Sequence, residues 1–202
     1  MTRQNQIVFH ENRTRILNYT MNHLQIHDEK ELSISKICHD LKISHNTFYN
    51  HYSNLGELYE DIRLNIFNDF KSGITKTFSS LNKTDENYVF SAICGFLDVI
   101  KGTSNSLKIL KKISNEKYLD EIINDRTKKF VLRFLQKPQQ KMQQTDVQIS
   151  IFINASMAII KTWEQNHFDL PEQYIANIIY TLFHSTCHDV EVTEDVLNLH
   201  CF

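Results

Sequence analysis

The sequence predicts an all-α protein, for two reasons. Its 202 residues include only four Gly and two Pro, so long stretches contain neither of the residues that most disfavour helices. Apolar residues recur at helical spacings of three and four, whereas the alternation typical of strands is rare. Apolar residues at 41% and charged residues at 23% are ordinary for a soluble globular protein. We therefore expect a three-helix domain over residues 1–54 and a larger helical domain over residues 55–202.

The first helix is expected over about residues 9–27, after a short arm that offers Arg3 to a phosphate or a minor groove. A polar connection at residues 27–31 separates it from the next helix. The inner face of the first helix is a stripe with spacings of three and four, made by Ile16, Leu17, Thr20, Met21 and Leu24.

Residues 33–59 predict two short helices joined by a tight turn, then the start of a third helix. Ser33 and Ser44 stand where N-caps are expected. The second of these helices, residues 44–52, contains no Lys, Arg, Asp or Glu, yet most of its side chains can form hydrogen bonds. A three-helix core would explain the apolar positions, including Phe48, but not this uncharged polar helix. Its polar groups suit insertion into a DNA major groove.

We expect Thr47 and Tyr49 to hold phosphates, and His45 and Asn46 to face base edges. Attraction to phosphate must come from local placement, because residues 1–70 contain seven Lys and Arg against nine Asp and Glu. We therefore expect modest affinity at physiological salt. The predicted DNA-contacting residues are Ser33, Ser35, Lys36, Lys42, Ser44, His45, Asn46, Thr47, Tyr49, Asn50 and His51.

The pattern IxxICxxLxISxxTFYxHYxxxxEL, which begins at Ile34 and ends at Leu58, resembles the DNA-binding motif of the TetR/AcrR family of transcriptional regulators. This resemblance implies a helix-turn-helix domain and a homodimer that binds a palindromic operator in double-stranded DNA, usually as a ligand-responsive repressor. Two residues depart from the family pattern. Lys42 replaces a Gly that adopts positive φ, at a cost on the order of 1 kcal/mol. Leu55 replaces a Lys that often contacts phosphate.

The fourth helix is expected from about residue 54 to 81, opened by a capping box at Asn54 and Glu57, and it links the two domains. Further helices are expected over 86–101, up to about 113 after a break at 102–104, and over 115–136. Residues 101–141 carry eleven Lys and Arg against four acidic residues. We interpret this stretch as solvated helix faces, with contact to flanking DNA or to an acidic ligand or partner as alternatives.

Two strongly apolar helices, about 146–168 and 171–188, are expected to close the fold on either side of residues 169–170. They are too apolar for one solvated side and include small residues, so we expect a two-fold interface built from two helices per subunit. Segments 96–110 and 159–179 look like the C-terminal domain of a TetR subgroup that includes an activator of dihydroxyacetone kinase genes. The predicted interface residues are Phe152, Ser156, Ile159, Ile160, Ile175, Ile178, Ile179, Leu182 and Phe183.

An unknown small-molecule effector is expected between the helices of residues 60–165, where aromatic residues could line a pocket. The same aromatic residues at helical spacing also fit an ordinary core. The residues predicted for such a pocket are Phe78, Phe90, Phe96, Tyr118, Phe130, Phe134 and Trp163.

Other functional classes find no support in the sequence. It has no phosphate-binding Gly-rich loop, nucleophile elbow or HExxH motif, so we expect no enzymatic activity and no cofactor. The pairs His23/His27 and His184/His188 lack a third ligand nearby, so we expect no metal. Four cysteines without a CxxC pair, and no signal peptide or membrane span, predict a cytoplasmic protein. The alternative to a DNA-binding regulator is a coactivator or adaptor that acts through a protein partner.

Overall fold

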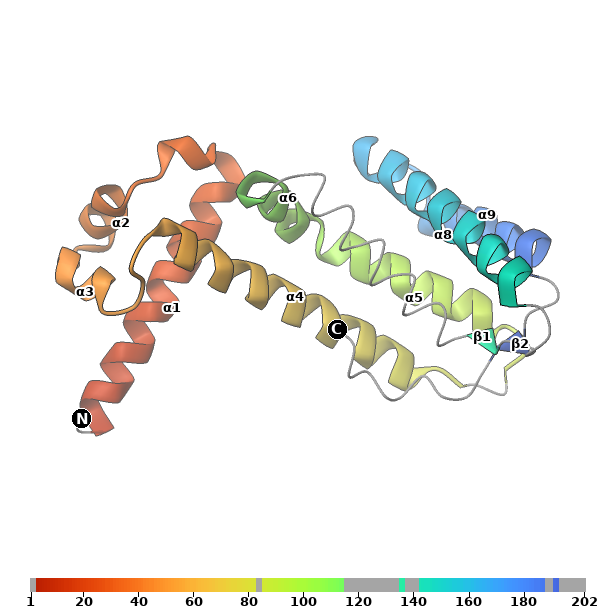
Figure 1. The fold of residues 1–202 in the computed structure, drawn as a ribbon, viewed down its shortest axis with the longest axis horizontal. Coiled ribbons are helices and arrows are strands. Elements are labelled where there is room, and N and C mark those ends of the chain that lie inside the picture. Colours follow the sequence, from red (N-terminus) through yellow and green to blue (C-terminus); the bar gives the residue numbers. More distant parts are fainter. Residues whose placement is uncertain (1–2, 83–84, 115–134, 137–141, 188–190, 193–202) are drawn as a thin grey trace. The chain divides into compact units, whose positions relative to one another are not determined.

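The computed structural model describes residues 3–82, 85–114, 135–136, 142–187 and 191–192. The predicted all-α fold class is confirmed, with one short pair of strands added to the helices (Figure 1). The helices are α1 (Arg3–Ile26), the 3₁₀ helix η1 (Glu29–Glu31), α2 (Ile34–Leu41), α3 (His45–Tyr49), α4 (Leu55–Ser80), α5 (Tyr88–Gly102), α6 (Ser104–Ile113), α8 (Met142–Gln165) and α9 (Glu172–Cys187). Strand β1 (Leu135–Gln136) pairs antiparallel with β2 (Glu191–Val192).

The chain divides into two compact units. Unit 1 comprises residues 1–68 and 105–116, and unit 2 comprises residues 69–104 and 117–202. Helix α4 therefore begins in unit 1 and continues into unit 2. The domain boundary expected near residue 54 remains a prediction about independent folding.

Unit 1 packs α2 and α3 beside α1 and the start of α4 (Figure 1). The stripe predicted for α1 points inward: Ile16 and Leu24 are fully buried. Of the five helix-turn-helix positions expected to be apolar core, Ile37 and Phe48 are buried, and they fix the two short helices within the unit. The other three, Ile34, Leu41 and Ile43, are half-buried. The buried apolar side chains of this unit are Ile16, Leu17, Leu24, Leu32, Ile37, Cys38, Phe48, Tyr52, Leu58, Ile62, Ile66, Ile109, Leu110 and Ile113.

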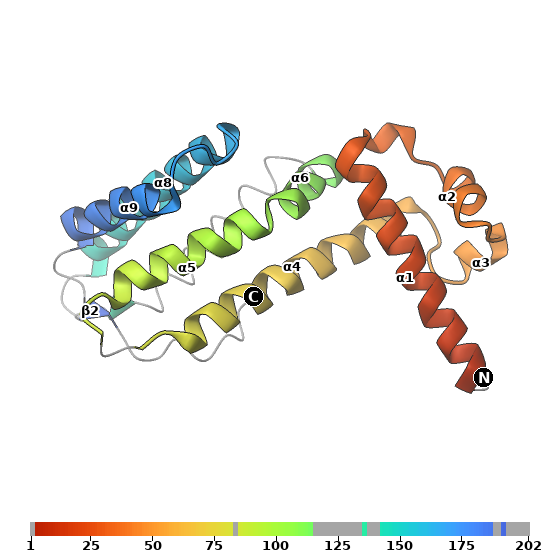
Figure 2. The ribbon, with the colours of Figure 1, turned by 180° about the vertical axis from the view of Figure 1, so that it is seen from behind.

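Unit 2 is built from the second part of α4 with α5, α8 and α9 (Figure 2). Helix α9 packs against both α8 and α5. Helices α4 and α5 approach closely at Gly95, where an added Cβ would lie 2.2 Å from Thr77 Cγ2. The buried core consists of Ile74, Phe78, Tyr88, Ala92, Leu97, Ile100, Ile149, Phe152, Ile153, Ile160, Trp163, Ile175, Ala176, Ile179, Phe183 and Cys187.

Several predicted boundaries are wrong. The first helix begins at Arg3 and not at about residue 9, so residues 3–8 of the expected arm are helical. The stretch from Arg3 to Phe9 contains no helix breaker, and the Phe9 ring packs on His51, which supports the first turns. The last two residues of the helix expected over 115–136 form strand β1 instead, and residues 115–134 lie outside the described residues. Helix α8 begins at Met142, before its expected start at about residue 146. The C-terminal tail, apart from β2, lies outside the described residues.

Candidate nucleic-acid interface

Both predicted N-caps are confirmed. The Ser33 hydroxyl accepts a hydrogen bond from the Lys36 amide at 3.2 Å, and it opens α2. The Ser44 hydroxyl accepts from the Thr47 amide at 3.0 Å, and it opens α3. Each cap satisfies an amide that a helix start would otherwise leave without a partner. These local bonds set where the two helices begin.

The turn between α2 and α3 has the left-handed backbone that the family resemblance implies at Lys42, with φ 54° and ψ 44°. The Ile43 amide donates to the Cys38 carbonyl at 3.0 Å, and the Lys42 amide donates to the His39 carbonyl at 3.2 Å. This pair of bonds is the Schellman motif, in which Gly is the usual left-handed residue. Lys42 therefore occupies a strained position, and its exposed side chain projects beside α3.

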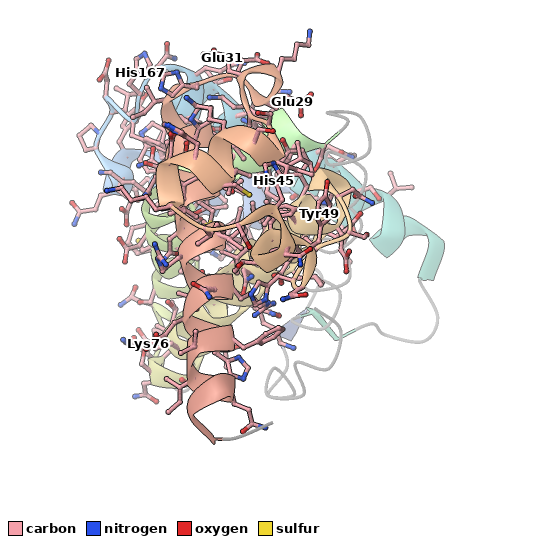
Figure 3. The ribbon with its side chains drawn as sticks, turned by 90° about the vertical axis from the view of Figure 1, so that its left-hand side faces the viewer. Glu29, Glu31, His45, Tyr49, Lys76 and His167 are labelled. Carbon is pink, nitrogen blue, oxygen red and sulfur yellow. The ribbon has the colours of Figure 1, made fainter. Side chains whose placement is uncertain are left out.

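Helix α3 has one buried face and one polar face. Phe48 is fully buried, and it anchors the helix to unit 1. Figure 3 looks onto the side of the molecule that carries α2 and α3, with His45 and Tyr49 labelled. The α-helix ends at Tyr49, three residues before the expected end at 52, and Asn50 forms its C-terminal cap. The exposed residues of α3 and its caps are Ser44, His45, Asn46, Tyr49 and Asn50.

Hydrogen bonds already hold several of the predicted contact groups. The hydroxyls of Ser44 and Thr47 lie 2.9 Å apart and bond to each other. The Oγ of Ser35, on α2, lies 3.3 Å from Nε2 of His45, which orients the imidazole. Among the described residues, the side-chain amides of Asn46 and Asn50 make no hydrogen bond. These two amides are therefore free to bond a ligand.

A carboxylate behind α3 joins three segments of unit 1. Asp61, on α4, accepts hydrogen bonds from Arg13 Nη2 of α1 at 2.5 Å and from the Tyr52 hydroxyl at 2.6 Å. Burial and the neighbouring carboxylate raise the pKa of Tyr52, which is 3% exposed, so the phenol stays protonated. The network fixes the chain just after α3 against both long helices. The sequence places these residues far apart, and it contains no signal that pairs them.

His51 lies against α1, with its ring centroid 4.1 Å from that of Phe9. Its Nδ1 is buried and has no hydrogen-bond partner. Burial, followed by the charges of Arg13 and His10, lowers the pKa of His51, so the ring is neutral at pH 7. The ring thus packs against α1 behind the polar face of α3, and its role as a DNA contact stays a prediction.

The start of α4 is capped as expected, with one difference. The Glu57 amide donates to the Asn54 side chain at 3.0 Å. The Glu57 carboxylate accepts the amide of Ser53, at 2.7 Å, rather than that of Asn54. Leu55, where a phosphate-binding Lys would complete the family pattern, is half-buried as the first residue of the helix.

Most cations around α3 already have partners. Arg13 pairs with Asp61. Arg15 Nη2 donates to the Leu41 carbonyl at 2.7 Å, at the end of α2. Within the described part of residues 6–82, Lys42 is an exposed cation beside α3 that makes no ion pair or side-chain hydrogen bond. It is the cation best placed to meet a phosphate.

A histidine pair stacks near the C-terminal end of α1. The rings of His23 and His27 are 4.6 Å apart with an interplanar angle of 21°, and Nε2 of His23 is buried without a partner. Burial, then the charges of His27 and Lys36, lower the pKa of His23. In the described part of the chain, no group of three or more His, Cys, Asp and Glu residues is arranged to hold a metal ion.

Two side chains join helix α6 to other helices of unit 1 by hydrogen bonds to backbone carbonyls. Lys112 Nζ donates to the carbonyls of Leu24 at 2.6 Å and His27 at 2.9 Å, at the C-terminal end of α1. Arg63 Nη1 of α4 donates to the Ile113 carbonyl at 2.6 Å. An ammonium at a helix C-terminus satisfies free carbonyls and matches the helix dipole. Helix α6 is thereby tied to both α1 and α4.

The aromatic residues predicted for a ligand pocket pack in the interior of unit 2 where they are described. Trp163 is 2% exposed, and its Nε1 donates to the Leu170 carbonyl at 2.9 Å. Phe78 is also buried, whereas Phe90 and Phe96 are partly buried. The other three predicted residues, Tyr118, Phe130 and Phe134, lie outside the described residues.

The residues predicted for a dimer interface divide into two groups. Six of them are buried inside unit 2 of the same chain: Phe152, Ser156, Ile160, Ile175, Ile179 and Phe183. Ile159 and Leu182 are partly buried, and Ile178 is 37% exposed. Most of these apolar residues of α8 and α9 therefore pack in the core of unit 2 of their own chain. The opposite faces of both helices are exposed and nearly uncharged, with Val147, Ile151, Asn154, Ala158 and Thr162 on α8 and Tyr174, Asn177, Ile178, Thr181 and Ser185 on α9.

Within the residues that the structure describes, no helix combines the length and apolarity needed to cross a bilayer.

Comparisons with known proteins do not show a family for this chain. No protein-family model matches the chain, and no curated protein matches it. Among solved structures, the chain is similar to one described as a "putative tetR family transcription regulator" from Shewanella sp. PV-4. The two chains share 12% sequence identity with a TM-score of 0.48, over 91% of this chain and 99% of the other. Function therefore has to be inferred from the residues of the interface.

Proposed function

We propose that this protein is a sequence-specific DNA-binding transcriptional regulator of the TetR type. The exposed polar face of α3 carries the proposal: the helix is capped by Ser44, anchored by buried Phe48, and presents free amides without any charged side chain. A short helix that is fixed from behind and uncharged in front suits the hydrogen-bonding edges of bases in a major groove.

The regulator acts as a homodimer on a palindromic operator. The exposed faces of α8 and α9 support this, because interface cores are depleted of charged residues. From Val147 to Thr162 the α8 sequence contains one charged residue, Lys161, and α9 contains only Glu172. A dimer that reads a palindrome needs its two α3 helices in successive major grooves, about 34–36 Å apart.

The dimer represses transcription until a small molecule binds in unit 2. Helix α4 belongs to both units, and α6 follows directly on α5 and contacts α1 and α4 through Lys112 and Arg63. A ligand that favours another arrangement of these helices would change the spacing of the two α3 helices on DNA. Of the aromatic residues predicted to line the pocket, Phe90 and Phe96 are partly buried, so such a ligand could reach their rings.

A gel-shift experiment with the DNA upstream of the protein's own gene tests the proposal. We expect a sequence-specific complex that weakens as salt rises, and that an excess of unrelated duplex DNA does not displace. Absence of any specific complex at low salt would refute DNA recognition by this protein. Ile151→Lys places a charge on the exposed face of α8 and should give monomers in sedimentation, whereas Leu64→Lys, on the exposed side of α4, should leave the dimer intact.

A second candidate is an adaptor that keeps the helix-turn-helix scaffold but acts through a protein partner. The excess of acidic residues in residues 1–70, and the existing partners of Arg13 and Arg15, favour it. Tyr49→Ala separates the two candidates, because Tyr49 is 52% exposed and its loss spares the core. A DNA reader loses regulation of its target gene with this variant, whereas regulation that survives would favour the adaptor.

A further inference from the structure

We propose that Asn46 reads an adenine in each operator half-site, and that α3 as a whole selects A·T rather than G·C base pairs. This inference rests on the proposed function and names the base that the interface recognises. It follows from which polar groups on α3 are free, and from which side chains α3 lacks.

Helix α3 and its flanking residues lack the charged side chains that most often contact guanine and cytosine. The commonest specific contact to guanine is an Arg or Lys that bonds its O6 and N7, and Glu or Asp accepts from the cytosine amino group. Residues 44–52 contain none of these four side chains. The side chains that remain are amides, hydroxyls and imidazoles. Of these, the amide of Asn or Gln matches adenine, because it donates to N7 and accepts from N6 at once.

Several polar side chains of α3 already form hydrogen bonds within the protein. The hydroxyls of Ser44 and Thr47 bond each other at 2.9 Å, and Ser44 also caps the helix. The Nε2 of His45 lies 3.3 Å from Ser35 Oγ, so one edge of that ring is occupied. The Tyr49 hydroxyl donates and accepts through one oxygen atom, so it does not present a separate donor and acceptor as a side-chain amide does.

Two free amides remain, and their positions differ. Asn46 is the second residue of α3, whereas Asn50 is the cap at its far end. Recognition helices of this motif contact base edges with their N-terminal residues. Asn46 is exposed, and its side chain makes no hydrogen bond within the described residues. A free amide near the N-terminus of the helix is therefore the group placed to form both bonds with adenine.

Selection of bound sequences from a random duplex library, with the full-length protein, tests this inference. The wild-type protein should enrich a two-fold symmetric motif with one adenine in each half-site. Its affinity for a half-site with this adenine should exceed that for another base by about five- to 140-fold, as typical bidentate contacts give. Asn46→Ala should lose that preference and retain the rest of the motif. Asn46→Asp should change the preferred base to cytosine, because a carboxylate accepts from the cytosine amino group.

Asn22→Ala is the matched control, because Asn22 is an exposed Asn on α1 outside the predicted interface. It should leave the motif unchanged. Replacing the selected adenine by 7-deazaadenine, which lacks the N7 acceptor, should weaken the wild-type complex but not the Asn46→Ala complex.

The outcomes separate the inference from the function on which it rests. If the wild-type protein enriches no motif, both are refuted. An enriched motif that Asn46→Ala leaves unchanged refutes the adenine contact and keeps the DNA-binding function. An adenine preference lost in Asn50→Ala, but not in Asn46→Ala, assigns the base to the other end of α3 and also refutes the inference.

Discussion

Replacing Lys42 with Gly should stabilise the helix-turn-helix. Lys42 has φ 54° and ψ 44°, a left-handed conformation that costs an L-residue roughly 1–2 kcal/mol. Gly avoids this cost but loses about 0.5–1 kcal/mol through the greater freedom of the unfolded chain. Both turn hydrogen bonds come from the backbone, so Gly retains them. The side chain is exposed and has no partner within residues 6–82, so little else changes. The net gain should be about 0.5–1 kcal/mol.

Hydrogen exchange of the amides in α2 and α3 is the appropriate measurement, because it reports on unit 1. The single tryptophan, Trp163, lies in unit 2, so its fluorescence follows the other unit. The expected gain corresponds to exchange slowed by about two- to fivefold. Lys42→Ala is the matched control, since it removes the same charge but keeps the Cβ that causes the strain. Equal stabilisation by both variants would assign the effect to charge and refute the conformational explanation, as would no change with Gly.

The same two variants separate stability from DNA affinity. If Lys42 contacts a phosphate, either substitution removes one released counterion, and the slope of log affinity against log salt should become shallower by about 0.9. Both variants should show this change equally, although only the Gly variant gains stability. An unchanged slope in both would exclude Lys42 from the phosphate contacts.

Three further predictions concern the packing and titration of other residues. Gly95→Ala should lower the urea midpoint of unit 2 by the equivalent of about 1–3 kcal/mol, because the added Cβ would overlap a methyl group on α4. Gly102→Ala is the control and should not destabilise unit 2, because an added Cβ meets open space there. Lys112→Met should speed hydrogen exchange in the last turn of α1 by the loss of about 1 kcal/mol, and exposed Lys108→Met should have no such effect. The folded chain lowers the pKa of His23 below 6.5, so the unfolded chain binds more protons between the two values. Stability should therefore fall as pH drops below about 6.5, and less so in His23→Gln; equal losses in both proteins would contradict this assignment.

The helix-turn-helix was predictable in detail because its determinants are local. Ser33 and Ser44 cap amides three residues away, and the spacing of Ile37, Cys38 and Phe48 defines a buried face over only a few turns. The strained turn at Lys42 was predictable from the family pattern, because the backbone there is set by the Schellman bonds and not by the side chain.

The residues of a dimer interface were harder to separate from the core, for a physical reason. An apolar stripe on α8 or α9 reports only that a face is buried, and it does not say whether the partner is the same chain or another. Ile160 and Ile175 pack inside unit 2, while Ile151 and Tyr174 on the opposite faces remain exposed. The packing of α9 against α8 and α5 decides which face is left for a partner.

By itself the sequence determined the helical fold class, the capped helices of residues 33–49 and the uncharged polar face of α3. Each of these depends on interactions between residues a few positions apart. Only the tertiary structure decided that Asp61 joins Arg13 to Tyr52, that Lys112 bonds the end of α1, and that His45 is held while Asn46 is free. Arg13 and Asp61 are 48 positions apart in the chain, and Leu24 and Lys112 are 88 apart. No local spacing records which distant side chains folding will bring within hydrogen-bonding distance.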